Sequence, residues 1–528
     1  MIRRSLVVLL MLAILVAIPL LLRPAGEKFS YGPEADKLVI VTPNTEMIKY
    51  EFRNAFRKHY QKKYGKDVNV EYRNVGGTSD IVRYINDRFV GEFRRYYLDK
   101  KPGEDFDTEI EGAFRNYYLD QPKALPGRAL EARKLFLASD IGIDIDLFWG
   151  GGTYDQGKVA AAGLAVDGKV RERHPEYFSD EVIPESFGGE LFFAPNGGYY
   201  GVCLSSFGIC YNKERVGDNP PLRWNDLGDP RFLNAIAVSD PTKSGSVTKC
   251  FEMMFQQAMY DAGADKNPEK LTQGWADGFN LIKRIVANSR YLTDSAGRIP
   301  RDVAKGDAAA GMCIDFYGLS EAEFDTAQSG REIIVYQMPL GGSAITADPI
   351  QLLRGAPNRV VAERFIDFLL SREGQQLWNY RPGTPGGPEK YALRRIPIRR
   401  DLYSEKDQQY MSDPNYNPYQ REDVLVYNGR WTGRYFNLMR VLIKDLVMEP
   451  DQELKEAYRE LVKNNFPPEA TLEFNKILIP FDEAAAAAKK LSVSDGWSVN
   501  DIVKMRRQWV TQAQEQYRRA RDLARAGR

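Results

Sequence analysis

Small hydroxyl residues, one glycine and one lysine are concentrated in residues 240–246, which read DPTKSGS. An apolar run precedes this motif and a helix-like stretch follows it, so the motif is predicted to join a strand to a helix. The first N–H groups of a helix have no partner within the helix, and the helix dipole places partial positive charge there. Two interpretations remain open: a binding site for an anion with charge from Lys243, or a helix cap supplied by one of the hydroxyls.

Three further strand-to-helix junctions carry similar residues, at 42–45, 76–79 and 150–154. The runs KLVIVTP, DVNVEYRNV and IDIDLFWGG are predicted strands with helices between them. This order indicates a mostly parallel sheet, whose junctions lie together at the carboxyl edge, where ligands bind. We therefore expect these ligand-binding residues at the four junctions: Thr42, Asn44, Thr45, Gly77, Thr78, Ser79, Gly151, Gly152, Thr153, Thr242, Lys243, Ser244, Gly245 and Ser246.

The N-terminus predicts export. Arg3 and Arg4 precede an uninterrupted apolar run at residues 6–22, which is the order of an export signal. The run approaches the length of a membrane span, and no clear cleavage site follows it. Residues 1–25 are therefore predicted to be either a cleaved signal peptide or a membrane anchor that leaves the protein tethered on the periplasmic side.

The composition is that of a globular protein. The 528 residues are 43% hydrophobic and 27% charged, and the net charge of +1 gives no reason to expect a nucleic-acid partner. The two histidines, His59 and His174, have no metal-ligand spacing with the cysteines, and no Ser/His/Asp order of a hydrolase is present. We expect no catalytic residues, no metal and no cofactor. Four cysteines either pair as disulfides in an unresolved order or stay buried as free thiols: Cys203, Cys210, Cys250 and Cys313.

The chain is predicted to form two α/β lobes and a helical C-terminal region. The first lobe is expected at residues 38–195, with an insertion at about 90–139, the second at 196–335, and a return to the first at 336–402. Two chain crossings would then flank an interlobe cleft, a preferred place for a small molecule. Residues 403–528 read as mainly helical and end in a helix with seven arginines, which packs on the first lobe, meets a partner or stays solvated.

The chain resembles the extracellular solute-binding proteins of ABC importers in five successive segments. These read DIDLFWGGGTYDQGKVAAAGL, YYGVCLSSFGICYNKERV, RWNDLGDPRFLNAIAVSDPTKSGSV, GDAAAGMCIDFYG and ADPIQLLRGAPNRVVAERFIDFLLSREGQQLW. The resemblance runs over most of residues 38–402 and is closest to the branch of ferric-iron, phosphonate and sugar-phosphate binders. It implies a two-lobed periplasmic-binding-protein type II fold with two crossover segments, here with an N-terminal membrane anchor and a helical C-terminal extension.

The resemblance also bears on the ligand. It places residues 240–246 and 150–154 in ligand-contacting loops of the two lobes, and residues 315–317 at the strand end where ferric-binding members present adjacent tyrosines. Only Tyr317 is present here, beside Phe316, and the loop TPNTE lacks the histidine of several iron binders. The resemblance therefore favours an oxyanion over ferric iron.

Two aspartates are expected to meet the rest of the ligand. Asp315 and Asp348 are candidates for its hydroxyl or amino groups, and Tyr317 is included with them in the predicted site. For Asp348 an ordinary turn stays open as an alternative, because Pro349 follows it.

The predicted function is capture of a small anionic solute, phosphorylated or carboxylated, by a monomeric, non-catalytic periplasmic protein that passes it to an ABC permease. Two alternatives remain: a ferric-iron binder of the same family, and a membrane-tethered sensory binding domain.

Overall fold

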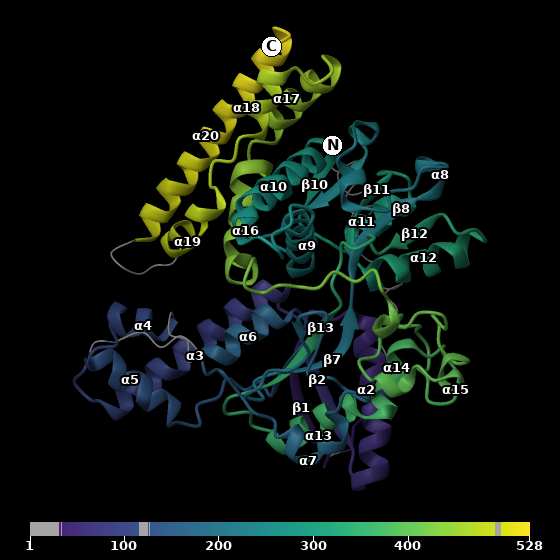
Figure 1. Cartoon of the computed structure of the whole chain (residues 1–528). Coiled ribbons are helices and arrows are strands. Elements are labelled where there is room, and N and C mark those ends of the chain that lie inside the picture. The colour runs from purple at the N-terminus through teal and green to yellow at the C-terminus, as the bar shows by residue number, and fades with distance from the viewer. Residues whose placement is uncertain (1–30, 33, 116–124, 126, 492–497) are drawn as a thin grey trace, which may run out of the picture.

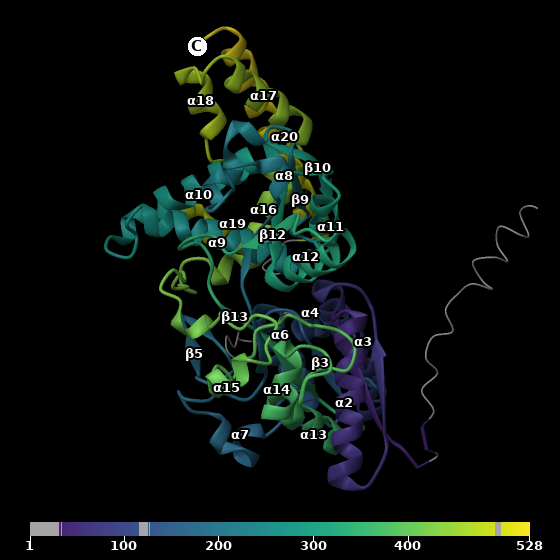
Figure 2. The same ribbon diagram turned by 90° about the vertical axis from the view of Figure 1, so that its right-hand side faces the viewer.

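The computed structural model describes residues 31–115, 125, 127–491 and 498–528, with residue 33 excepted. Two α/β lobes lie one above the other, and the C-terminal helices lie beside the upper lobe (Figures 1 and 2). The mixed α/β architecture and the helical C-terminal region are as predicted. The predicted signal peptide or anchor, residues 1–25, lies outside the described residues; within them, no helix has both the length and the apolar character that a membrane span needs.

The first lobe is built on one sheet with the strand order β2-β1-β3-β13-β4, and β7 also pairs with β13. β1 runs parallel to β2 and β3, as expected for strands joined by helices, while β13 is antiparallel to β3. The strands are β1 Asp36–Val41, β2 Val68–Arg73, β3 Leu147–Trp149, β4 Ala165–Val166, β7 Tyr200–Ser205 and β13 Thr346–Leu353.

Helices cover both faces of this sheet. The connecting helices α2 (Glu46–Tyr64) and α3 (Thr78–Lys100) follow the predicted periodicity, and α2 buries Phe52, Phe56 and Tyr60 against the sheet. The other helices of this lobe are α4 Thr108–Arg115, α5 Gly127–Leu137, α6 Thr153–Ala161, α7 Val170–Arg173, α13 Arg359–Leu370, α14 Arg372–Asn379 and α15 Glu405–Gln408.

One predicted helix is in fact two. The segment 359–378 reads as a single amphipathic helix, but it is divided at Ser371 into α13 and α14. The Ser371 hydroxyl accepts a hydrogen bond from the Gly374 N–H at 3.1 Å and so caps the second helix.

The second lobe is built on a sheet with the order β10-β9-β11-β8-β12. Its strands are β8 Phe207–Asn212, β9 Ile236–Ser239, β10 Ser289–Thr293, β11 Ala310–Ile314 and β12 Ile334–Gln337. Its helices are α8 Lys213–Val216, α9 Gly245–Asp261, α10 Leu271–Ala287, α11 Arg298–Ala304 and α12 Asp315–Ser329. The four cysteines are free and buried, which agrees with the thiol alternative.

Two crossings between the lobes were expected, and the chain makes them at Ser206 and at residues 338–345. The first crossing is Ser206, because β7 belongs to the first sheet and β8 to the second. It therefore lies later than the expected boundary at residue 196, inside a continuous run of buried residues. The second crossing is residues 338–345, between β12 and β13.

Packing on the first lobe was one expectation, but the C-terminal helices pack mainly on the second lobe. Trp275 of α10 donates from Nε1 to the Ile479 carbonyl at 3.0 Å, and Lys283 donates to the Phe474 carbonyl at 2.9 Å. The two parts share one hydrophobic core. The helical elements of this region are α16 Phe436–Ile443, the π-helical turn η8 Lys444–Met448, α17 Asp451–Lys463, α18 Pro468–Asn475, α19 Phe481–Lys490 and α20 Val499–Arg525.

The arginines at the C-terminus are largely neutralised by carboxylates of the same region. The ion pairs are Arg506–Asp445, Arg518–Glu453, Arg519–Glu473, Arg521–Glu456, Arg525–Glu460 and Arg528–Glu469. These pairs link the C-terminal arginines to neighbouring helices, while the arginine side chains stay 23–62% exposed to solvent.

Candidate functional site: the interlobe cleft

A cleft of about 830 Å³ lies between the two lobes. Residues of both lobes and of the C-terminal region line it. Twelve of the predicted site residues are among them: Asn44, Gly77, Thr78, Gly151, Gly152, Thr153, Lys243, Ser244, Gly245, Ser246, Tyr317 and Asp348. Folding thus brings the four junctions to one place, as expected for the carboxyl edges of two facing α/β sheets.

Four helices begin at this cleft. The first residues of α3 and α6 face it from the first lobe, and those of α9 and α12 from the second. The first N–H groups of a helix lack partners within that helix, and each N-terminus carries partial positive charge. At α12 the chain already uses these donors, because the Asp315 N–H donates to the Ser206 carbonyl at 3.0 Å and the Phe316 N–H to the Asp315 carboxyl at 2.7 Å. The arrangement is suited to holding an oxyanion by backbone donors.

Small residues let these helix ends come close together. Gly151 has φ +86°, and a Cβ atom added to it would lie 2.5 Å from Cγ2 of Thr78. Across the cleft, a Cβ atom added to Gly77 would lie 3.2 Å from the Lys243 carbonyl oxygen. Larger side chains at Gly151 would therefore push α3 and α6 apart.

The residues of the DPTKSGS motif have different roles. Asp240 accepts hydrogen bonds from the Thr242 N–H at 2.8 Å and the Thr242 hydroxyl at 2.6 Å, so that hydroxyl is engaged within the loop. The Ser244 hydroxyl accepts from the Val247 N–H at 3.3 Å and caps α9. Lys243 is exposed at the cleft and has no ion pair within the described part of the chain. Capping therefore explains Ser244, while Lys243 stays available to a solute.

Five predicted residues do not line the cleft: Thr42, Thr45, Ser79, Thr242 and Asp315. Thr42 is fully buried, and its hydroxyl accepts from the Asn44 N–H at 3.0 Å. Thr45 precedes the first turn of α2, and Ser79 lies in the first turn of α3. The first four of these residues lie at the predicted junctions. The hydroxyls of Thr42 and Thr242 are hydrogen-bonded within their own loops, and the Ser79 hydroxyl is buried.

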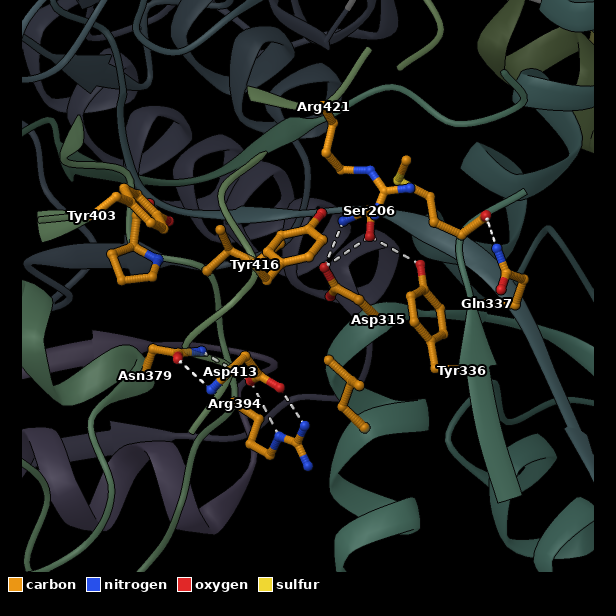
Figure 3. A pocket seen from close by; sticks show the side chains of 14 residues that line it. Ser206, Asp315, Tyr336, Gln337, Asn379, Arg394, Tyr403, Asp413, Tyr416 and Arg421 are labelled. Carbon is orange, nitrogen blue, oxygen red and sulfur yellow. Dashed lines mark hydrogen bonds and ion pairs between the residues drawn. The ribbon is translucent and has the colours of Figure 1, made fainter. Parts of the chain in front are cut away.

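Asp315 lies instead beside the first crossing between the lobes, at Ser206, which we call the hinge. Its Oδ2 accepts from the Ser206 N–H at 2.6 Å and its Oδ1 from the Phe316 N–H at 2.7 Å. Figure 3 shows it beside a second, smaller cavity of about 190 Å³, with Tyr336 and Tyr416 nearby. Burial raises the pKa of Asp315 to about 7. This carboxyl fastens the first crossing to the start of α12.

Asp348 lies within β13 and not in a turn. The strand changes register between Asp348 and Pro349, which is where a β-bulge accommodates proline. The carboxylate of Asp348 pairs with Arg395, which also donates to the Ser205 hydroxyl at 2.7 Å. The Arg395 guanidinium lies 4.2 Å from the ring centroid of Phe316, and Arg395 lines the cleft. Sequence reasoning missed Arg395, since nothing in the stretch ALRRIP separates a buried arginine from a surface one.

A second ionic cluster was also missed. Lys249 of α9 lies 2.6 Å from Glu190 and 2.9 Å from Glu252, and Tyr427 donates to Glu252 at 2.8 Å. All four residues line the cleft. Burial opposes the charge on Lys249, but the two carboxylates outweigh it and hold its pKa well above the usual value.

The tyrosines at the cleft favour their neutral form. Burial raises the pKa of Tyr199 to about 12 and also raises the pKa values of Tyr317 and Tyr427. At neutral pH they are therefore phenols and not phenolates. Among the described residues, no group of three or more His, Cys, Asp or Glu side chains is placed to hold a metal ion.

Comparisons with known proteins show a similarity to one family over part of the chain. Residues 176–403 match the model of the family "bacterial extracellular solute-binding protein". An uncharacterized protein of Haemophilus influenzae is 26% identical over 238 residues, which are 43% of this chain and 59% of that protein. The phosphoglycerate transport regulatory protein PgtC of Salmonella typhimurium is 23% identical over 179 residues, or 33% of this chain and 39% of that protein. The chain therefore spans less than two thirds of either relative.

The fold also has a solved counterpart. The periplasmic binding protein AfuA from Actinobacillus pleuropneumoniae, solved with exogenous fructose-6-phosphate bound, is 18% identical. The match has a TM-score of 0.51 and covers 78% of this chain and 99% of that one, which shows the shared two-lobed fold. The resemblance predicted from the five segments is thus confirmed: the chain is related to the extracellular solute-binding proteins of ABC importers, which bind small solutes and work with membrane permeases.

Proposed function

We propose that this protein captures a small organic anion in its interlobe cleft on the periplasmic side of the membrane, as a monomer, and passes it to an ABC permease. The observation that carries the proposal is the meeting of the N-termini of α3, α6 and α9 around one cleft, with Lys243 at its edge, for which the described residues provide no ion pair. Together they supply the donors and the positive charge that an oxyanion needs.

The size of the cleft favours an organic solute over a bare ion. A volume of about 830 Å³ lies within the range of about 300–1,000 Å³ typical of small-molecule pockets. The names of two similar proteins mention phosphoglycerate and fructose-6-phosphate, which supports a phosphorylated solute. The donors at the cleft suit a carboxylated solute as well.

Ferric iron is the competing solute within the family. A similar protein from Synechocystis, 22% identical over 193 residues, is named iron uptake protein A1. Ferric iron prefers deprotonated oxygen ligands such as phenolate. The raised pKa of Tyr317 works against that form, so the site favours the organic anion.

A thermal-shift screen tests the proposal. The panel contains fructose 6-phosphate, phosphoglycerate, citrate, inorganic phosphate and ferric iron. A ligand that binds only the folded state at 100 times its Kd stabilises it by about 2.7 kcal/mol, so we expect a clear rise in melting temperature with an organic anion. The matched controls are Lys243→Ala, which should reduce the shift, and Lys62→Ala on the exposed face of α2, which should not.

Two results would contradict the proposal. One is a shift with ferric iron alone, which would establish the competing solute. The other is steady conversion of a bound panel compound, because the protein is expected to release its solute unchanged.

A further inference from the structure

The chain passes between the lobes a third time. After α15 in the first lobe, residues 421–435 run to the second lobe, where the C-terminal helices begin. We call this segment the third connection. Its Tyr427 N–H donates to the Gly188 carbonyl of the first lobe at 2.7 Å. One residue later, the Asn428 carbonyl accepts from the Gln256 side chain of α9 at 2.8 Å. The third connection is thus bonded to both lobes.

An ion pair between the lobes lies beneath the third connection. Glu190 belongs to the short strand β6 (Glu190–Leu191), in a hairpin beside β7 of the first lobe, whereas Lys249 and Glu252 belong to α9 of the second. The side chains of Lys249, Glu190 and Glu252 are only 14%, 6% and 0% exposed. The Lys249 ammonium lies 3.8 Å from the ring centroid of Tyr427, which covers it. The pair between Glu190 and Lys249 is therefore shielded from water. The attraction between two charges is stronger in such a place than on the protein surface.

The C-terminal helices contact the first lobe at a second point. Arg440 of α16 lies 3.4 Å from Asp155 of α6, and both side chains are buried. Beside them, the rings of Phe436 and Tyr154 lie 4.6 Å apart. Hinge opening would separate these pairs together with Glu190 and Lys249, because each joins the first lobe to an element fixed on the second.

We propose that Lys249 is a positioning residue that holds the two lobes together before any solute binds. Lys249 does so through Glu190, under the cover of the third connection. The cleft is then closed and assembled in the solute-free protein, so the helix N-termini need not be brought together by the solute. The inference rests on the proposed function only in treating this cleft as the binding site, and its test uses no solute.

Distances between spin labels on the two lobes test the inference. Lys62→Cys on α2 and Asp265→Cys after α9 are both exposed, and the four native cysteines are buried and out of reach of the label. Pulsed electron paramagnetic resonance without solute should give one narrow distance distribution. Glu190→Gln removes the interlobe pair but leaves Lys249 paired with Glu252, so this variant should stay folded and show a broader distribution at longer distances.

Glu252→Gln is the matched control, since it removes a carboxylate from the same cluster but keeps the pair between the lobes. It should retain the narrow distribution. A broad distribution in the parent protein, or one that Glu190→Gln leaves unchanged, would overturn the inference. So would an equal broadening in both variants. A failed solute screen would leave these distances unaffected, so the two proposals fail separately.

Discussion

The two sides of the cleft present different chemical groups. On the side of the helix ends, at Gly77, Gly152 and Gly245, the residues are small and the donors belong to the backbone. On the hinge side, charged side chains are already paired with one another, as Arg395 is with Asp348. A solute's charge can be met only where the protein has not neutralised its own. Under the proposed function the helix ends meet the charge of the solute, whereas the pair of Arg395 and Asp348 stabilises the first lobe beside the crossing.

The largest effect is expected from breaking the hinge side. Arg395→Met removes the cationic partner of Asp348, whose side chain is 14% exposed. Loss of one partner of a buried pair costs about 3–5 kcal/mol of stability. Urea unfolding measures this loss. The control is Arg359→Met, whose pair with Glu363 is half exposed and should cost at most about 1 kcal/mol. Equal losses of unfolding free energy in the two variants would show that the pair of Arg395 and Asp348 contributes no more than an exposed pair.

Asp315 is expected to contribute one component of the pH dependence of stability. Its pKa is raised from 3.8 to about 7, so the folded state holds this proton more firmly than the unfolded state. The stabilisation is fully present below about pH 4 and is lost as the pH rises to about 7. Asp315→Asn should flatten this part of the profile in urea unfolding at pH 4 to 8. An unchanged slope in Asp315→Asn, relative to the exposed control Asp265→Asn, would assign the dependence to other groups.

The smallest effect on stability is expected at the start of α9, where one serine caps the helix and another faces the cleft. Ser244→Ala removes the cap of α9 and should cost about 1 kcal/mol of stability. Ser246→Ala keeps that cap while removing the neighbouring hydroxyl at the cleft. We expect Ser244→Ala to lower the melting temperature more than Ser246→Ala does. If the two variants melt alike, the capping role assigned to Ser244 is wrong.

The sequence was informative where local patterns decide structure. Alternating apolar runs located the strands β1, β2 and β3, and the Gly- and Ser-rich junctions between elements pointed to the cleft. These features depend on neighbours in the chain, since an apolar period and a capping residue act over a few positions. The division of residues 359–378 at Ser371 also had a local signal, a serine followed by Arg-Glu-Gly, that could have been used.

The missed features depend on contacts between distant segments. Arg395 and Asp348 are 47 residues apart in the sequence, and Glu190 meets Lys249 only because the chain crosses between the lobes. The crossing at Ser206 was hidden because β7 and β8 are both fully buried and read as one apolar run. The Thr42 hydroxyl appeared available in the sequence, but a nearby backbone N–H occupies it. Local reasoning therefore found the loops of the site but not its charged framework.

Calorimetric titration of Lys243→Ala tests the central claim most directly. The titrant is whichever organic anion of the panel stabilises the parent protein most, and Lys62→Ala is titrated beside it. Charged hydrogen bonds contribute about 1.5–3 kcal/mol, so Lys243→Ala should weaken binding by about tenfold or more while its melting temperature without solute stays unchanged. Equal affinities in the parent protein, Lys243→Ala and Lys62→Ala would contradict the account, because the solute's charge would then be held elsewhere.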